Sequence, residues 1–314
     1  MDSRQALVTP EQDQTTLASV VRELMDGLSW SKSRSLVKTG RVQVNGELRF
    51  DPAERVRAGA RVEINPSGRK RRAPVLERER IVHVDRDLVV VRKPAALISV
   101  PYDDDDTRDT LIERTRQALR EYGLREEGSR SDRLLVVQRL DKDTTGLLVF
   151  ARTRAGRKGL EAQFRAHSIT RRYVALVHGR ATAAVHDSHL IANRGDGRRG
   201  SWRGGNPPKA AKRAITKVRV EAQLRSGRDE ATLVSCLLDT GRQHQIRIHL
   251  AEAGNPLIGE QVYDRRHRQR RLQAARPMLH AASLGFRHPV NNRPLRFEAP
   301  PPDDFAALLA ELGG

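Results

Sequence analysis

An acidic, turn-forming segment that runs directly into an apolar strand is the most constraining feature of this sequence. It spans residues 139–149 and reads RLDKDTTGLLV. Cationic neighbours favour the ionised form of a carboxyl group, and an ionised carboxylate can act as a nucleophile or a base. The chain has 58 Lys and Arg against 39 Asp and Glu, a formal net charge of +19, which predicts a salt-dependent attraction to polyanions. The expected substrate of this carboxylate is therefore a nucleic acid.

Composition argues against several other classes of protein. No apolar run approaches the roughly 20 residues that span a bilayer. Residues 1–16 are polar and lack the apolar core of a secretion signal, and we interpret them as a disordered tail. The single cysteine, Cys236, lies in an apolar run, and no Cys/His spacing matches a zinc site. These features predict a cytoplasmic protein without disulfide, metal or membrane segment.

Residues 17–64 have the pattern of a small α+β domain. Leu17, Val20, Val21 and Leu24 recur at helical spacing. Ser31 or Ser33 is expected to cap a second short helix. Residues 41–48 alternate and turn at an Asn-Gly pair, which predicts a hairpin, and residues 61–64 supply a closing strand. Residues 65–79 are then interpreted as a basic linker, because a Pro-Ser-Gly break precedes the run at 69–72.

The larger remainder, residues 80–314, predicts an α+β fold with a mixed, largely antiparallel sheet. Strands outnumber helices, and the two do not alternate strictly. Helices are expected over 109–122, after Thr153, and over 244–253. The expected strands lie at 81–84, 88–93, 134–137, 146–151, 172–177, 214–220 and 232–238.

Several ordered segments of this remainder carry a resemblance to a known family. They lie at 85–94 (DRD…VRKP), 139–148, 171–179 (RRYVALVHG), 240–250 (TGRQHQIRIHL), 254–259 and 277–282. In this order they are very similar to RluA-type pseudouridine synthases of the ribosomal large-subunit branch. Residues 17–64 in turn resemble the ribosomal-protein-S-four-type RNA-binding domain that commonly precedes that catalytic domain.

The resemblance implies a reaction and three catalytic residues. A uridine in RNA is isomerised to pseudouridine, which requires no cofactor and no metal. Asp141 corresponds to the family's catalytic aspartate, Arg247 to the arginine that pairs with it, and Tyr173 to the tyrosine that stacks on the target base and is expected to help remove its C5 proton. From the residues alone, Asp141 could instead cap a turn, Arg247 could bind phosphate, and Tyr173 could belong to a sheet core. Whether the aspartate is nucleophile or base stays open.

Two basic surfaces are candidates for RNA binding, although both could consist of solvated charges. The helical face of the small domain is one, and the catalytic segment with a Gly- and Arg-rich loop at 193–213 is the other. Their candidate residues are Lys32, Arg34, Lys38 and Arg41 on the first, and Arg139, Arg198, Arg199 and Arg203 on the second. A second basic cluster lies at 265–271. Extruding a base from its stack costs a few kcal/mol, which such contacts would offset.

The sequence departs from the family pattern at Gln138, where His is common, and at Gln243, where Thr is usual. Both residues can form hydrogen bonds, so we expect changed positioning and retained chemistry. An acidic tract at 103–106 is interpreted as a solvated loop. Alternative functions are a non-catalytic RNA-binding or ribosome-assembly factor, a transfer-RNA pseudouridine synthase, and a hydrolytic N-glycosidase. The resemblance implies ribosomal RNA as the first expected partner and transfer RNA as the second, bound by a monomer.

Overall fold

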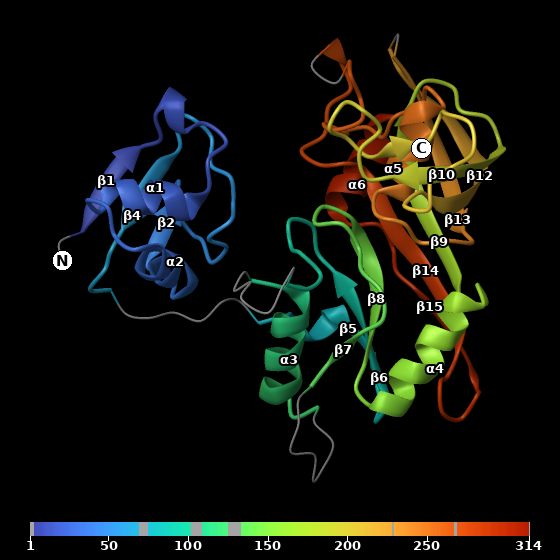
Figure 1. Ribbon diagram of the computed structural model, residues 1–314, viewed down its shortest axis with the longest axis horizontal. Coiled ribbons are helices and arrows are strands. Elements are labelled where there is room, and N and C mark those ends of the chain that lie inside the picture. Colours follow the sequence, from blue (N-terminus) through green and yellow to red (C-terminus); the bar gives the residue numbers. More distant parts are fainter. Residues whose placement is uncertain are drawn as a thin grey trace. The chain divides into compact units, whose positions relative to one another are not determined.

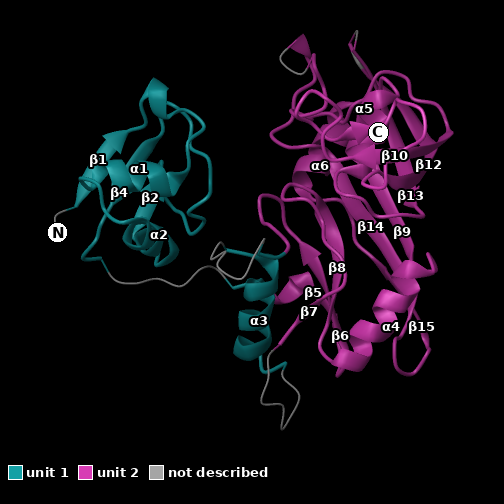
Figure 2. Cartoon of the chain, viewed as in Figure 1, with its two compact units in different colours: residues 1–77, 100–124 teal, residues 78–99, 125–314 magenta. Residues whose placement is uncertain are grey.

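A computed structural model describes residues 3–68, 75–101, 109–124, 133–227, 229–266 and 269–313, which form two compact units. The first unit contains residues 1–77 and 100–124, and the second contains 78–99 and 125–314 (Figure 2). Residues 100–124 thus belong to the first unit, whereas the sequence analysis assigned them to the larger domain. The basic run at 69–72 and the acidic tract at 103–106 lie outside the described residues.

The first unit is built on a four-stranded sheet in the order β1-β4-β2-β3 (Figure 1). Its strands are β1 (Arg4–Leu7), β2 (Val42–Val44), β3 (Glu47–Leu48) and β4 (Arg61–Ile64). The expected disordered tail is therefore wrong for residues 4–7, which pair antiparallel with β4. Val8 explains the order of this segment, because its side chain is buried in the core and its N–H donates to the Ala60 carbonyl.

Two helices cover this sheet, and α3 (Leu111–Glu121) also belongs to the unit. Helix α1 (Leu17–Leu24) begins after Thr16, whose hydroxyl accepts from the Ser19 N–H, and it buries the apolar face that its spacing predicted. Helix α2 (Trp30–Lys38) is capped by Ser29, not by Ser31 or Ser33 as expected. The side chain of Ser33 is buried, and its hydroxyl donates to the Trp30 carbonyl instead.

The second unit contains an eleven-stranded mixed sheet, as expected. Its order is β11-β10-β12-β13-β9-β14-β8-β6-β5, with β15 on β14 and β7 on β8. Among the described pairings only β14 with β8 is parallel. The strands are β5 (Ile81–Val84), β6 (Leu88–Lys93), β7 (Leu135–Val136), β8 (Thr145–Ala151), β9 (Thr170–His178), β10 (Ala184–Ile191), β11 (Gly200–Ser201), β12 (Lys212–Ser226), β13 (Asp229–Leu238), β14 (Leu279–Arg287) and β15 (Pro294–Glu298).

Helices α4 (Arg154–Arg165), α5 (Gln245–Glu252) and α6 (Asp303–Glu311) belong to this unit, together with the short 3₁₀ helix η2 (Arg78–Arg80). A second 3₁₀ helix, η1 (Pro10–Gln12), belongs to the first unit. Strand β8 lies inside the sheet between β14 and β6, and all seven of its residues are buried. Leu160 of α4 packs in the apolar cluster that contains Leu147 and Val149 of β8. None of the described helices is long and apolar enough to cross a membrane.

A close approach between β8 and β14 fixes the start of β8. Gly146 has φ +113°, and a Cβ atom at this position would lie 2.3 Å from the Ala281 carbonyl oxygen. Only glycine tolerates both constraints. Ala281 is in register with Gly146 on one side and with Tyr173 of β9 on the other. The sheet therefore brings Tyr173 close to the segment that precedes β8.

Buried His280 on β14 should make folding stability pH-dependent. Its Nδ1 lies 2.8 Å from the Thr145 hydroxyl and its Nε2 3.1 Å from the Ala299 carbonyl oxygen, and burial lowers its pKa to about 4. The unfolded chain has a histidine pKa of about 6.5, so at pH values between 6.5 and 4 it binds more protons than the folded protein does. Stability should therefore fall as pH drops through that window, by up to about 3 kcal/mol from this residue.

Urea unfolding at a series of pH values between 7 and 4 checks this expectation. His280→Gln should flatten the pH dependence relative to the wild type, because it removes the titrating group. The control His167→Asn changes an exposed histidine, and its φ of +54° suits asparagine. If His167→Asn flattened the profile as much as His280→Gln, the assignment to His280 would be wrong.

Candidate active site

Asp141 lies in the turn that leads into β8, and hydrogen bonds to its neighbours hold this turn. The Thr144 N–H donates to the Asp141 carbonyl oxygen at 3.2 Å. The Ser99 hydroxyl donates to the Leu140 carbonyl oxygen at 2.7 Å and accepts from the Leu140 N–H at 3.0 Å. The Asp141 side chain is 23% exposed. The turn thus presents a carboxylate that solvent and a substrate can reach from one side.

A buried lysine supports the same turn from beneath. Lys93, at the end of β6, is only 1% exposed, and its Nζ donates to the carbonyl oxygens of Lys142 at 2.6 Å and Pro94 at 2.8 Å. Burial lowers the pKa of Lys93 to about 7. The negative charges of Asp143 and Asp141 act in the opposite direction and raise this pKa, but burial has the larger effect. Lys93 is a positioning residue that the sequence analysis did not single out, although its Lys-Pro motif was noted.

Arg247 of α5 reaches Asp141 from a distant part of the sequence. Its Nη1 lies 3.6 Å from Asp141 Oδ2. The structure therefore brings together the carboxylate and the guanidinium that the resemblance paired. At this distance the contact is an ion pair without a hydrogen bond, which leaves the carboxylate oxygens available to a substrate.

The main partner of Arg247 is Glu260, which the sequence analysis missed. Arg247 donates from Nε to Oε2 at 2.7 Å and from Nη2 to Oε1 at 2.9 Å. Glu260 is fully buried, and its Oε1 also accepts from the N–H groups of Val262 and Tyr263. Burial favours the neutral carboxyl, but Arg247 outweighs it and lowers the pKa of Glu260. Burial also disfavours the charged form of Arg247, but the hydrogen bonds and charge of Glu260 raise the pKa of Arg247 above its ordinary value.

His244 and Tyr263 complete the wall of the site beside Asp141. His244 Nε2 lies 3.9 Å from Asp141 Oδ1, and its Nδ1 lies 2.7 Å from the Tyr263 hydroxyl. Burial lowers the pKa of His244 and raises that of Tyr263 to about 12. Arg247 Cζ lies 5.4 Å from the centre of the Tyr263 ring, a cation–π distance. Arg247 therefore contacts the Tyr263 ring as well as the carboxylate of Glu260.

Tyr173 lies on β9 between β13 and β14, with 8% of its surface exposed. Burial raises the pKa of its phenol to about 12, and the negative charge of Asp141 adds to this effect while Arg171 opposes it. Tyr173 thus lies within electrostatic reach of Asp141, as its position in the sheet requires. Its phenol keeps its proton at neutral pH.

The start of α5 is held by a buried glutamine, which explains how Arg247 is aimed. Gln245 Nε2 donates to the Ile215 carbonyl and to the Thr216 hydroxyl of β12, while its Oε1 accepts from the Thr240 hydroxyl and the Arg242 N–H. His244, just before the helix, has φ +58°. All the hydrogen-bonding capacity of the Gln245 amide is used, so α5 is tied to β12 at its first residue.

The two residues that depart from the family pattern have different environments. Gln243 is exposed beside α5. Gln138 is half-buried, and its Nε2 atom is buried without a hydrogen-bond partner among the described residues. A buried amide donor left unpaired costs about 1–3 kcal/mol of folding stability. Gln138 therefore destabilises the segment that ends three residues later at Asp141.

The basic residues predicted to bind RNA differ in their placement. Arg199 lies close enough to His244 and Tyr263 to affect the pKa of both, and it therefore borders the site. Arg139, Arg198 and Arg203 are exposed in the second unit. In the first unit, Lys32 and Arg34 are exposed, whereas Lys38 and Arg41 are partly buried.

The Gly- and Arg-rich loop at 193–213 is not simply a solvated loop, because ion pairs and hydrogen bonds hold part of it in place. Arg194 pairs with Asp196 at 3.0 Å and with Glu252 of α5 at 3.4 Å. The Ser201 hydroxyl also donates to Glu252, at 2.5 Å. These contacts tie the loop to the helix that carries Arg247.

Among the described residues, one group has the ligand types of a metal site: Asp85, Asp87 and His288. Their hydrogen bonds account for it without a metal. His288 Nδ1 accepts from the N–H groups of Val290 and Asn291, and its Nε2 lies 3.2 Å from Asp85 Oδ2. Nε2 therefore carries the ring proton and donates it to Asp85, which closes the turn between β5 and β6.

Comparison with known proteins agrees with this geometry. Residues 87–252 match the family model described as RNA pseudouridylate synthase. The chain belongs to this family. The match includes Asp141, Tyr173 and Arg247 and ends before Glu260 and Tyr263.

Relatives of similar length support the assignment. A protein of Zymomonas mobilis named ribosomal large subunit pseudouridine synthase D is 32% identical, over 99% of this chain and 98% of its own. A protein of the same name from Vibrio parahaemolyticus is 31% identical, over 94% and 90%. Among solved structures, human RNA pseudouridylate synthase domain containing 1 aligns with a TM-score of 0.55 and 25% identity, over 73% of this chain and 86% of that one.

Proposed function

We propose that this pseudouridine synthase acts on uridine in large-subunit ribosomal RNA, with Asp141 as its catalytic carboxylate. The observation that carries the proposal is the convergence of Asp141 and Arg247, at 3.6 Å, on a partly open face of the second unit. The relatives from Zymomonas and Vibrio, named as ribosomal large subunit enzymes, support the choice of RNA.

The isomerisation breaks the bond from C1′ of the ribose to N1 of uracil and forms a bond from C1′ to C5. The C5 proton is then released and N1 takes up a proton, so the product has the same atoms as the substrate. Asp141 starts the reaction by attacking the sugar or by removing a proton from it, and both routes need an unprotonated carboxylate. Arg247 favours that form and orients it, because a guanidinium keeps its charge in proteins.

Tyr173 has a contact role in this proposal. A phenol with a pKa raised to about 12 holds its proton at neutral pH and is a poor base. It can pack against the target base and donate a hydrogen bond near Asp141. Removal of the C5 proton therefore falls to another group or to solvent.

Capture of the RNA depends on cationic surfaces in both units. On α2, Trp30, Arg34 and Lys38 follow each other at a spacing of four residues, which places them on one face. Trp30 is 45% exposed and Arg34 lies over its ring, so this face offers an aromatic surface and positive charge to RNA. In the second unit, we expect Arg139, Arg198, Arg199 and Arg203 to contact phosphates.

All the proposed catalytic groups come from one chain, so a monomer is the expected working form. The relatives named as ribosomal large subunit enzymes favour the cytoplasm as its location. The experiment is a map of pseudouridine in total RNA from a strain that lacks the gene, before and after it is restored. Restoration should return pseudouridine to one or more uridines of large-subunit ribosomal RNA. A return confined to transfer RNA would overturn the choice of substrate, and release of free uracil would indicate hydrolysis.

A further inference from the structure

A cavity of about 590 Å³ lies on the second unit, away from Asp141. It is lined by Arg133, Leu135, Arg152, Arg154, Arg157, Lys158 and Glu161. Five of these side chains are cationic and one is anionic. Pockets for small organic ligands are mostly apolar, and here Leu135 is the single apolar residue. The lining suits a polyanion.

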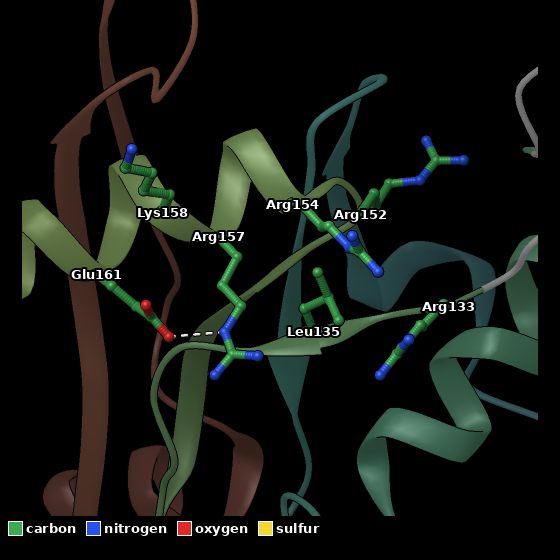
Figure 3. Close-up of a pocket in the computed structure, with 7 residues that line it drawn as sticks. All are labelled: Arg133, Leu135, Arg152, Arg154, Arg157, Lys158 and Glu161. Carbon is green, nitrogen blue, oxygen red and sulfur yellow. Dashed lines mark hydrogen bonds and ion pairs between the residues drawn. The ribbon is translucent and has the colours of Figure 1, made fainter.

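Figure 3 shows how these side chains lie. Leu135 forms the floor, with the guanidinium groups of Arg133 and Arg154 on one side and that of Arg157 on the other. Glu161 pairs with Arg157 at 2.7 Å, from one turn further along α4. Glu161 is the single carboxylate among the lining residues, against five cations.

The position of three of these cations is unfavourable for the helix itself. Arg154, Arg157 and Lys158 lie in the first two turns of α4 and are exposed, and the first turn contains no acidic residue. Backbone dipoles make this end of a helix positive, so cations here cost stability instead of adding it. An anionic ligand would offset that cost.

The length of β8 separates this cavity from the catalytic turn. Asp141 precedes the strand and Arg152 follows it. Seven residues at about 3.3 Å each make a separation of about 23 Å. A single nucleotide cannot reach from one to the other, whereas a strand of several nucleotides can.

We infer that the cavity binds backbone phosphates of the same RNA whose uridine is at Asp141, several nucleotides away from that uridine. This inference rests on the proposed function for its ligand. Several guanidinium groups around an open floor can bind successive phosphates without reading sequence. The cavity therefore adds affinity for long or structured RNA and takes no part in the chemistry.

The test is a triple variant, Arg154→Gln with Arg157→Gln and Lys158→Gln. Glutamine has nearly the helix propensity of Arg and Lys, so α4 should be retained. Two RNAs that contain the modified uridine are compared. One has a stem of three base pairs and the other a stem of ten, so that only the longer A-form stem can span the distance of about 23 Å between the two sites.

On the long RNA, the variant should show an increase in KM on the order of tenfold, and the slope of log affinity against log salt should fall by about two. On the short RNA, KM should be unchanged, and kcat should be unchanged on both. A matched control, Arg180→Gln with Arg219→Gln and Arg225→Gln, removes three exposed cations elsewhere in the second unit.

An equal loss in the control, or an equal loss on both RNAs, would overturn the inference. So would a variant that binds long RNA like the wild type, as expected if the cavity serves an acidic protein. Binding to large-subunit transcripts is measured alongside turnover. If the wild type makes no pseudouridine, the proposed function fails, while the binding comparison still decides the role of the cavity.

Discussion

Asp141→Asn should abolish pseudouridine formation while leaving RNA affinity within a few fold of the wild type. Asparagine has nearly the same shape as aspartate, so the turn before β8 and its hydrogen bond from Thr144 should persist. The amide can neither attack a sugar carbon nor accept its proton. The expected fall in kcat is on the order of 10⁴-fold or more, the size seen when a group essential to covalent chemistry is removed.

Single-turnover assays with enzyme in excess separate chemistry from binding, and filter binding at several salt concentrations measures affinity. Asp239→Asn is a matched control, because Asp239 pairs with Lys217 away from the catalytic turn. It should retain turnover. Substantial activity in Asp141→Asn would contradict the assignment, and a loss of RNA affinity equal to the loss of activity would make Asp141 a binding residue.

The architecture of the second unit could be predicted largely from local patterns. Strand β8 was foreseen because a turn precedes an apolar run, and α4 because Thr153 caps it. Strand β14 was not foreseen as a strand. It begins Leu-His-Ala-Ala-Ser, residues with little preference for strands, and its burial between β8 and β9 decides its conformation.

The two errors in the first unit have a similar origin. Strand β1 is short, and most of its residues are exposed, so its sequence lacks the alternation of a half-buried strand. Only the pairing with β4 makes it regular. Helix α2 is capped by Ser29, one turn before the expected Ser33, whose side chain is buried within the helix.

For the candidate site, the sequence pointed to side chains that the fold brings near one another, and it did not point to the residues that hold Arg247 in place. Asp141, Tyr173 and Arg247 each lie in a recognisable motif. Glu260 lies thirteen residues after Arg247, beyond one helix and one turn, and nothing in its local sequence marks it as buried. Its role follows from tertiary packing, because a buried guanidinium needs a partner that the chain must bring from elsewhere.

Removal of Arg247 should have two effects, a loss of turnover and a loss of stability. Arg247→Met leaves the fully buried carboxylate of Glu260 without its partner. Breaking a buried pair in this way typically costs about 3–5 kcal/mol. Turnover should also fall strongly, because Asp141 loses the charge that orients it at 3.6 Å.

The double variant Arg247→Met with Glu260→Gln separates the two effects. Glutamine keeps an acceptor for the N–H groups of Val262 and Tyr263 but carries no charge, so most of the lost stability should return. Activity should remain lost, because Asp141 still has no guanidinium beside it. Urea unfolding and single-turnover rates measure the two quantities on the same preparations. If the double variant regained turnover together with stability, Arg247 would serve only to neutralise Glu260, and the proposed pairing with Asp141 would be wrong.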